Sequence, residues 1–237
     1  NMHYGPNLIS YPFQTTQYIE DALGDSAALS TFALVGEGMA TINIDNAWFG
    51  SLETFEAGSG YWLAALENFS FTFNETEESL SRMASQPIIR AVPDRFSYEN
   101  STKQAFYFIE SATIKNQPLE DDDIIITYNN NIIVGSRYWN GEYTDVPAIG
   151  LDEYISNEGY CKAGDQITFK VWDSSENELI NMDPGSEIFW DDLSVSLVNL
   201  TELLPDQFSL ANAYPNPFNP TTTLNFSLPI ESEVHII

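Results

Sequence analysis

The sequence is poor in basic residues. Only 8 Lys and Arg stand against 35 Asp and Glu, which gives a formal net charge of -27 across 237 residues. A nucleic-acid surface needs clustered Lys and Arg to neutralise phosphates, so this class of function is strongly disfavoured. Contact with anionic lipid is disfavoured for the same reason. An acidic excess of this size keeps a protein soluble and attracts divalent cations.

Cysteine is limited to Cys161, so no internal disulfide can form. We expect Cys161 to be a small buried hydrophobe beside Gly159 and Tyr160, while pairing between molecules stays open as the alternative in a secreted chain. No apolar run approaches the roughly 18 residues of a membrane-spanning helix. The sequence begins at Asn1 rather than Met and shows no signal peptide, which favours a mature or trimmed product.

Little in the sequence points to catalysis. The two histidines, His3 and His235, lie near opposite ends, so no histidine base is available beside a central nucleophile. One cysteine and two remote histidines cannot supply a closed zinc site. Paired carboxylates for glycoside hydrolysis are uninformative, because 35 acidic residues always offer pairs. We therefore expect no catalytic residues and a protein that is not an enzyme.

Short apolar and aromatic runs separated by turn residues dominate the chain, and they predict a mainly β protein. The apolar fraction of 43% and the aromatic fraction of 14% are ample for packed cores. We predict a small β-rich α+β module with one short helix over residues 1–75 and a linker over 76–97. An antiparallel immunoglobulin-like β-sandwich is predicted over 98–202, followed by a partial C-terminal segment over 203–237.

The first module is expected to contain strands and one helix. The helix should span residues 15–24, with Thr15 or Thr16 as its cap and Gly24 at its end. Strand-length runs cover residues 7–13, 31–35, 39–44, 47–52, 61–66 and 69–73. In the second block such runs cover residues 105–114, 123–128, 131–139, 166–172, 187–190 and 194–200.

The segment from Tyr214 to Pro229 reads YPNPFNPTTTLNFSLP. Its prolines impose an extended or turning lead-in, and the alternation from Thr223 to Leu228 predicts a half-buried strand. Residues 207–237 closely resemble the opening of the type A C-terminal sorting domain of the type IX secretion system. That resemblance implies an immunoglobulin-like sandwich and export across the outer membrane of a Gram-negative bacterium, to the cell surface or the medium.

Two other regions resemble modules of proteins that the same system exports. Residues 4–74, with the phrases VGEG, WFGSL and GSGYWL, resemble a small module of large multi-domain proteins. The phrases QAFYF and VGSRYW resemble β-sandwich modules that precede such sorting domains. Neither resemblance implies a catalytic activity.

The C-terminal segment also suggests a mode of assembly. In the sorting family several further strands follow, whereas this sequence stops at Ile237. We therefore expect the apolar runs at residues 221–228 and 234–237 to pair with a neighbouring subunit, as in a self-assembling fibre subunit, a homo-oligomer or an adhesin. The expected pairing residues are Leu224, Phe226, Leu228, Val234 and Ile236.

Two acidic clusters are candidate metal ligands. Adjacent carboxylates repel one another, and a hard cation such as calcium relieves that repulsion with oxygen ligands. The alternative is that both clusters are solvated turns. The candidate calcium ligands are Asp121, Asp122, Asp123, Asp191 and Asp192.

Aromatic residues around the Asn140-Gly141 turn suggest glycan binding. Tyr138, Trp139 and Tyr143 could stack on sugars, so an exported carbohydrate-binding module with a polysaccharide partner is the alternative function; packing at the edge of the core is the competing structural interpretation. Candidate glycosylation sites are also present, with ordinary polar turns as the alternative at each. They are Asn68, Asn74, Asn100, Asn199, Asn225 and Ser26.

Overall fold

The computed structural model describes residues 1–75, 88–152, 158–204, 207–217, 220–229 and 234–235. It divides the chain into two compact units, Asn1–Thr201 and Glu202–Ile237. The fold is mainly β, as the sequence predicts, with several sheets and one well-formed helix among the described residues.

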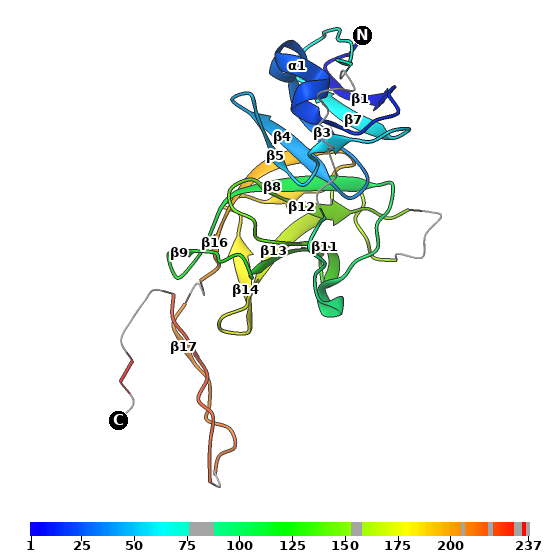
Figure 1. Cartoon of the computed structure of the whole chain (residues 1–237). Helices are drawn as coiled ribbons and strands as arrows, with labels where there is room; N and C mark the ends of the chain where they lie inside the picture. The colour runs from blue at the N-terminus through cyan, green and yellow to red at the C-terminus, as the bar shows by residue number, and fades with distance from the viewer. Residues whose placement is uncertain (76–87, 153–157, 205–206, 218–219, 230–233, 236–237) are drawn as a thin grey trace. The chain divides into compact units, whose positions relative to one another are not determined.

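The first unit begins with a five-stranded antiparallel sheet (Figure 1). Its strands, in sheet order, are β1 (Gly5–Ser10), β7 (Gly60–Ala65), β3 (Thr31–Val35), β4 (Ala40–Ile44) and β5 (Ala47–Gly50). Two short strands, β2 (Gln17–Tyr18) and β6 (Thr54–Phe55), pair separately. The helix α1 (Ile19–Leu29) buries its apolar side in a cluster with Leu34 and Leu63 of this sheet.

The predicted limits of the helix are wrong at both ends. Its N-cap is Tyr18, and no side-chain cap bond is present, because the preceding residues are drawn into the extended pair β2–β6. Gly24 does not end the helix but interrupts it, with φ of 69°. The helix resumes after this kink because Ala27 buries against the same core as Leu23.

The second sheet of this unit has nine strands. Along its main path the order is β11 (Ile132–Tyr138), β10 (Ile124–Asn129), β13 (Gln166–Asp173), β14 (Glu178–Asp183), β16 (Val195–Glu202), β8 (Gln104–Ile114) and β12 (Thr144–Ile149). The short strands β15 (Ile188–Phe189) and β9 (Gln117–Pro118) pair with β13 and β8. The pairs β11–β10, β10–β13, β13–β14 and β8–β12 and those of the two short strands are antiparallel, whereas β16 pairs with β8 in parallel, so the sheet is mixed.

This sheet curls until its two end strands meet, which gives a sandwich-like half-barrel. Gly135 of β11 lies so close to β12 that an added Cβ would be 1.8 Å from the Pro147 carbonyl oxygen. The hydroxyl of Thr127 donates a hydrogen bond of 2.6 Å to the same oxygen. Because glycine has no Cβ, it allows this close approach of the two backbones.

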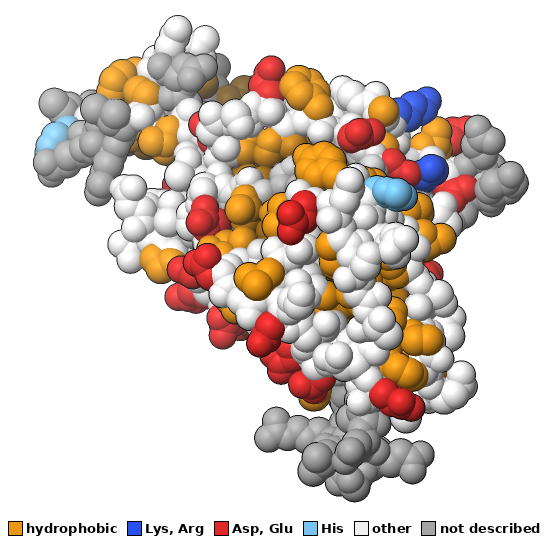
Figure 2. Space-filling view, turned by 90° about the horizontal axis from the view of Figure 1, so that it is seen from above, with side chains coloured by type: hydrophobic (Ala, Val, Ile, Leu, Met, Phe, Trp, Pro, Cys, Tyr) orange, Lys and Arg blue, Asp and Glu red, His pale blue; other side chains and the backbone are white. Residues whose placement is uncertain are grey.

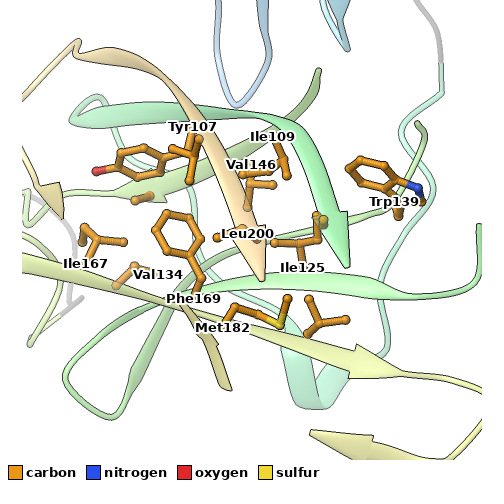
Figure 3. Packing of buried hydrophobic residues seen from close by; sticks show 14 of the residues in the cluster. Tyr107, Ile109, Ile125, Val134, Trp139, Val146, Ile167, Phe169, Met182 and Leu200 are labelled. Atoms are coloured by element: carbon orange, nitrogen blue, oxygen red, sulfur yellow. The ribbon is translucent and has the colours of Figure 1, made fainter. Parts of the chain in front are cut away.

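The concave side of the curled sheet encloses the main core. Figure 3 shows Tyr107, Phe169 and Leu200 pointing toward one another from three different strands. Cys161 belongs to this cluster and is 1% exposed, which confirms the prediction that it is a buried hydrophobe.

Strand β8 is apolar on both faces and joins the two sheets. Tyr107 and Ile109 face the main core, while Phe106 and Phe108 pack with Val35 and other residues of the five-stranded sheet. Successive strand residues point to opposite faces, so a run such as AFYFI requires cover on both sides. The module at residues 1–75 and the curled sheet consequently belong to one compact unit.

Several predicted strands differ from the structure. Residues 69–73 form no strand, and only a bridge from Met2 to Phe69 is present. Strands β12 and β14 were not predicted, since Pro147 argues against a strand and the β14 sequence is polar. In the predicted linker, residues 76–87 lie outside the described part, and Asp94–Phe96 forms a short 3₁₀ turn.

The second unit contains little regular structure. Strands β17 (Ser209–Leu210) and β18 (Phe226–Ser227) pair with each other, and an isolated bridge joins Tyr214 to Thr223. The prediction of a strand over residues 221–228 is therefore correct only for Phe226 and Ser227, near its C-terminal end. Proline has no backbone N–H, and Pro220 and Pro229 flank this segment, so a strand longer than two residues does not form here.

The exposed face in Figure 2 carries many acidic side chains and few basic ones. Within the part of the chain that the structure describes, no helix has the length and apolar character that a membrane crossing requires.

Candidate ligand-binding cleft

Four segments of the first unit line a cleft of about 460 Å³. They are β5 with the residues just after it, residues 88–90, the turn before β10 that contains Asp121, and the turn that joins β11 to β12. Small-molecule sites occupy about 300–1,000 Å³, so the cleft has the size of such a site.

Aromatic residues line much of the cleft. Trp48 and Phe49 come from β5, and Tyr138 and Tyr143 come from the two ends of the β11–β12 turn. The rings of Phe49 and Tyr143 are 4.8 Å apart at an angle of 47°. All four residues are half-buried, so each is held by packing and still reached by solvent. We refer to these four residues as the aromatic wall.

The turn between β11 and β12 fixes the position of Tyr143. Gly141 adopts φ of 87° and Tyr143 φ of 63°, so the chain reverses within a few residues. The Thr144 hydroxyl donates to the Gly141 carbonyl at 2.8 Å and accepts from the Asn140 N–H at 2.9 Å. These bonds hold the turn that presents the Tyr143 ring to the cleft.

The predicted glycan-stacking residues fall in two environments. Tyr138 and Tyr143 belong to the aromatic wall. Trp139 also borders the cleft but is only 8% exposed and packs in the main core.

A buried ion pair lies under the cleft. Arg137 Nη2 is 3.3 Å from Asp145 Oδ2, and the two side chains are 9% and 4% exposed. Arg137 also donates to the Asp145 carbonyl at 2.9 Å and to the Gly38 carbonyl at 3.0 Å. Asp145 Oδ2 accepts from the Ser51 hydroxyl at 2.6 Å and from the Ala40 N–H at 3.4 Å. This network joins the five-stranded sheet to the curled sheet.

The surroundings of Asp145 act on its pKa in opposite directions. Burial raises the pKa of this carboxyl, and the Arg137 guanidinium and the hydrogen bond from Ser51 oppose that rise. The net direction is upward, because complete removal from water disfavours the charged form. Arg137 is therefore the main group that allows a carboxylate to persist at this position.

Three exposed carboxylates line the cleft: Glu53, Asp121 and Glu142. Within the described residues, none of them forms an ion pair with a basic side chain, whereas both arginines of the cleft do. Arg90 pairs with Asp122 at 2.8 Å, and its guanidinium lies 3.6 Å from the centre of the Tyr138 ring.

Two of the three carboxylates in the first acidic cluster, those of Asp122 and Asp123, have partners. Asp122 pairs with Arg90. Asp123 is 5% exposed and accepts hydrogen bonds from the Glu120 N–H at 2.9 Å and the Ser174 N–H at 3.0 Å. Asp121 keeps an exposed carboxylate at the cleft.

The second acidic cluster lies elsewhere. Asp192 binds the Lys103 ammonium at 2.9 Å and the Gln104 N–H at 3.1 Å, and Asp191 accepts from the Asp192 N–H. Gln104 pairs with the last residue of β12, whereas the first cluster lies beside the turn that precedes β12. The two clusters are thus at different ends of that strand. Among the described residues, no group of three or more His, Cys, Asp or Glu is placed to hold a metal ion, and calcium binding stays a prediction.

All the candidate glycosylation residues are exposed. Asn68 accepts from the Tyr4 N–H, Asn74 donates to the Asp21 carbonyl, and Asn199 bonds to Glu110 and Ser111. Asn100, Asn225 and Ser26 are also accessible, so exposure does not separate modified sites from polar turns.

The predicted pairing residues lie in the second unit. Leu224 is 39%, Phe226 47% and Val234 44% exposed. Leu228 is half-buried, and Ile236 lies outside the described residues.

Sequence reasoning did not find the contribution of the first module to the cleft. Trp48, Phe49 and Glu53 are remote in sequence from the β11–β12 turn, and contacts between the two sheets, through β8 and through the Arg137–Asp145 network, bring them together. One signal was available: Arg137 is one of only 8 basic residues, and it stands within the apolar run IIVGSRYW. A buried arginine requires a carboxylate partner, which is Asp145.

Comparison with protein-family models, with curated proteins and with solved structures gives no match. The functional argument therefore rests on the geometry of the cleft, on the C-terminal unit and on the resemblance of its motif.

Proposed function

We propose that this chain is an exported cell-surface protein with a structural or adhesive role, whose C-terminal unit pairs with a neighbouring copy. The observation that carries the proposal is the exposure of apolar residues in that unit. Leu210 is 73%, Phe208 62% and Phe226 47% exposed.

The geometry of the second unit favours pairing. Strands β17 and β18 contribute only two residues each, and an isolated two-stranded hairpin is at best marginally stable in water. Exposed strand edges recruit further strands through backbone hydrogen bonds. Burying a Phe or Leu side chain stabilises an interface by about 1.5–3 kcal/mol, so a few such residues supply a substantial driving force.

The proposed location follows from the PNPFNPTT motif and its resemblance to a type IX sorting domain. Export of this kind places a protein on the surface of a Gram-negative bacterium or in the medium. The net charge of -27 is compatible with such a setting, since it maintains solubility and repels nonspecific association.

Assembly can be tested in the full chain by light scattering and electron microscopy over a concentration series. Phe226→Ser and Leu224→Ser should reduce assembly, because they replace apolar contacts with hydroxyls. Deleting residues 207–237 should have the same effect. Leu29→Ser is the matched control, since Leu29 is 70% exposed in α1 of the first unit. A chain that stays monomeric at every concentration, or equal assembly of Phe226→Ser, would contradict the proposal.

The cleft favours a second function, that of a glycan-binding module. Half-buried aromatic rings, polar groups at the rim and a suitable volume are the features of a sugar site. A glycan array probed with the full chain tests this function, and Tyr138→Ala should weaken any binding by removing part of the aromatic wall. An array on which no glycan retains the protein would count against it.

A further inference from the structure

The cleft lacks an uncommitted positive group among its described residues. Arg137 is held by Asp145 and Gly38, and Arg90 is held by Asp122. By contrast, Glu53, Asp121 and Glu142 line the cleft without an ion-pair partner in the described part of the chain. An anionic ligand would therefore meet three carboxylates and no available counter-charge.

The aromatic wall already binds a cation of the protein itself. The Arg90 guanidinium lies 3.6 Å from the centre of the Tyr138 ring, which is the geometry of a cation–π contact. The Arg90 side chain is 56% exposed. This wall thus has the electrostatic character that attracts organic cations, and one of its rings demonstrates it.

The neighbourhood of Tyr143 is also electronegative. Loss of hydration raises the pKa of the Tyr143 phenol, and the carboxylates of Glu110, Glu142 and Asp45 raise it further. These acids come from three different segments, so the negative field belongs to the fold and not to one charged run. It favours a positive group near the ring.

We infer that the cleft recognises a glycan that carries free, protonated amino groups, an inference that rests on the second proposed function. The sugar ring stacks on the aromatic wall beside the Tyr138 ring that Arg90 covers, and the ammonium donates to the rim carboxylates. Uronic acids and sulfated sugars are disfavoured by the same carboxylates. N-acetylated sugars keep the stacking surface but lose the charge, so they bind more weakly.

Short ligands are needed to test the inference, because a chain with a net charge of -27 attracts any polycation nonspecifically. Calorimetric titration of the full chain should compare glucosamine oligomers of a few units with their N-acetylated counterparts and with uronate oligomers. The free-amine oligomer should bind about threefold to tenfold more tightly than the N-acetylated one, the range of one partly exposed cation contact. The uronate oligomer should not bind.

The pH dependence gives a second readout. An amine with a pKa near the usual α-amino range of about 7.7–8.0 loses its charge as pH rises through that range, while ordinary carboxylates stay ionised. The preference for the free-amine oligomer should therefore disappear at high pH, and binding of the N-acetylated oligomer should change little.

Charge variants assign the effect to the cleft. Glu142→Gln and Glu53→Gln should each lower affinity for the free-amine oligomer about threefold or more and leave the N-acetylated oligomer unaffected. Glu178→Gln is the control, since Glu178 is exposed on β14 and does not line the cleft. Equal binding of both oligomers, or equal effects of the control and cleft variants, would overturn the inference while glycan binding stands. No binding of any oligomer would overturn glycan binding as well.

Discussion

Replacing Arg137 by methionine would test the buried ion pair that joins the two sheets. Methionine approximates the length of the arginine stem but supplies neither charge nor donors. The change removes the contact to Asp145 and the hydrogen bond to the Gly38 carbonyl, which connects β11 to the first module. Because Asp145 is 4% exposed at its side chain, water cannot replace the lost partner.

Arg137→Met should lower the free energy of unfolding substantially. Removing one partner of a buried ion pair costs about 3–5 kcal/mol of the free energy of unfolding, because a buried charge is left unpaired. The double variant Arg137→Met/Asp145→Asn should recover part of this loss, since no unpaired charge remains. Asp145→Asn still offers an oxygen to the Ser51 hydroxyl and the Ala40 N–H.

The cost should depend on pH in a defined direction. Burial raises the pKa of Asp145, and Arg137 opposes that rise, so the variant should raise this pKa further. A carboxyl whose pKa is raised in the folded state contributes stability that is complete below the unfolded value of about 3.9 and is lost as pH rises through the folded pKa. Relative to the wild type at the same pH, Arg137→Met should therefore be less destabilised under acidic conditions than at neutral pH.

Urea unfolding followed by circular dichroism provides the measurement, with wild type, single variants and double variant compared at each pH. A loss below about 1 kcal/mol for Arg137→Met, or a double variant no more stable than the single one, would refute the argument that this pair is a buried, coupled contact.

Three further results are expected. Gly135→Ala should lower the free energy of unfolding by about 3 kcal/mol, because its Cβ would be 1.8 Å from a β12 carbonyl oxygen. The control Gly60→Ala, with no atom nearer than 3.6 Å, should lower it by less than about 1 kcal/mol. Equal denaturant midpoints for the two variants would contradict this expectation. Burial raises the pKa of Asp173, but hydrogen bonds from the following turn, first that of the Glu176 N–H, lower it by more. The stability that wild type has over Asp173→Ala should thus be present above about pH 3.9 and be lost as pH falls through the folded pKa, and a pH-independent difference in melting temperature would contradict this. Burial raises the pKa of Cys161 to about 12, so a thiol reagent at mildly alkaline pH should label it only after unfolding, and rapid labelling of the folded protein would refute its burial.

Local patterns predicted much of the fold. Strand β3 was predicted with its observed limits, and β10, β11 and β13 were located to within a residue or two, because apolar and β-branched runs report burial directly. The start of the helix was misplaced because pairing of β2 with β6 overrides the capping preference of the nearby threonines, and its end was misplaced because Gly24 kinks the helix without ending it. Strand β12 was not predicted because proline is tolerated in a strand only at positions such as a sheet edge, and the sequence does not show that Pro147 lies at such a position.

The candidate cleft was only half predictable. Tyr138 and Tyr143 flank a recognisable turn, so their proximity follows from the sequence. Their neighbours Trp48 and Phe49 reach the cleft through packing of the first module on β8, a contact between segments far apart in the chain. No local pattern encodes such a contact, although the two apolar faces of β8 indicate that something must cover it.

Hydrogen–deuterium exchange of the full chain at increasing concentration would test the central claim most directly. The amides of residues 220–228 form few backbone pairs in the second unit, so in dilute solution they should exchange rapidly. If neighbouring copies pair through this segment, its amides should gain protection as concentration rises, while those of β10 and β13 stay protected throughout. Protection of residues 220–228 that does not change with concentration would contradict subunit pairing.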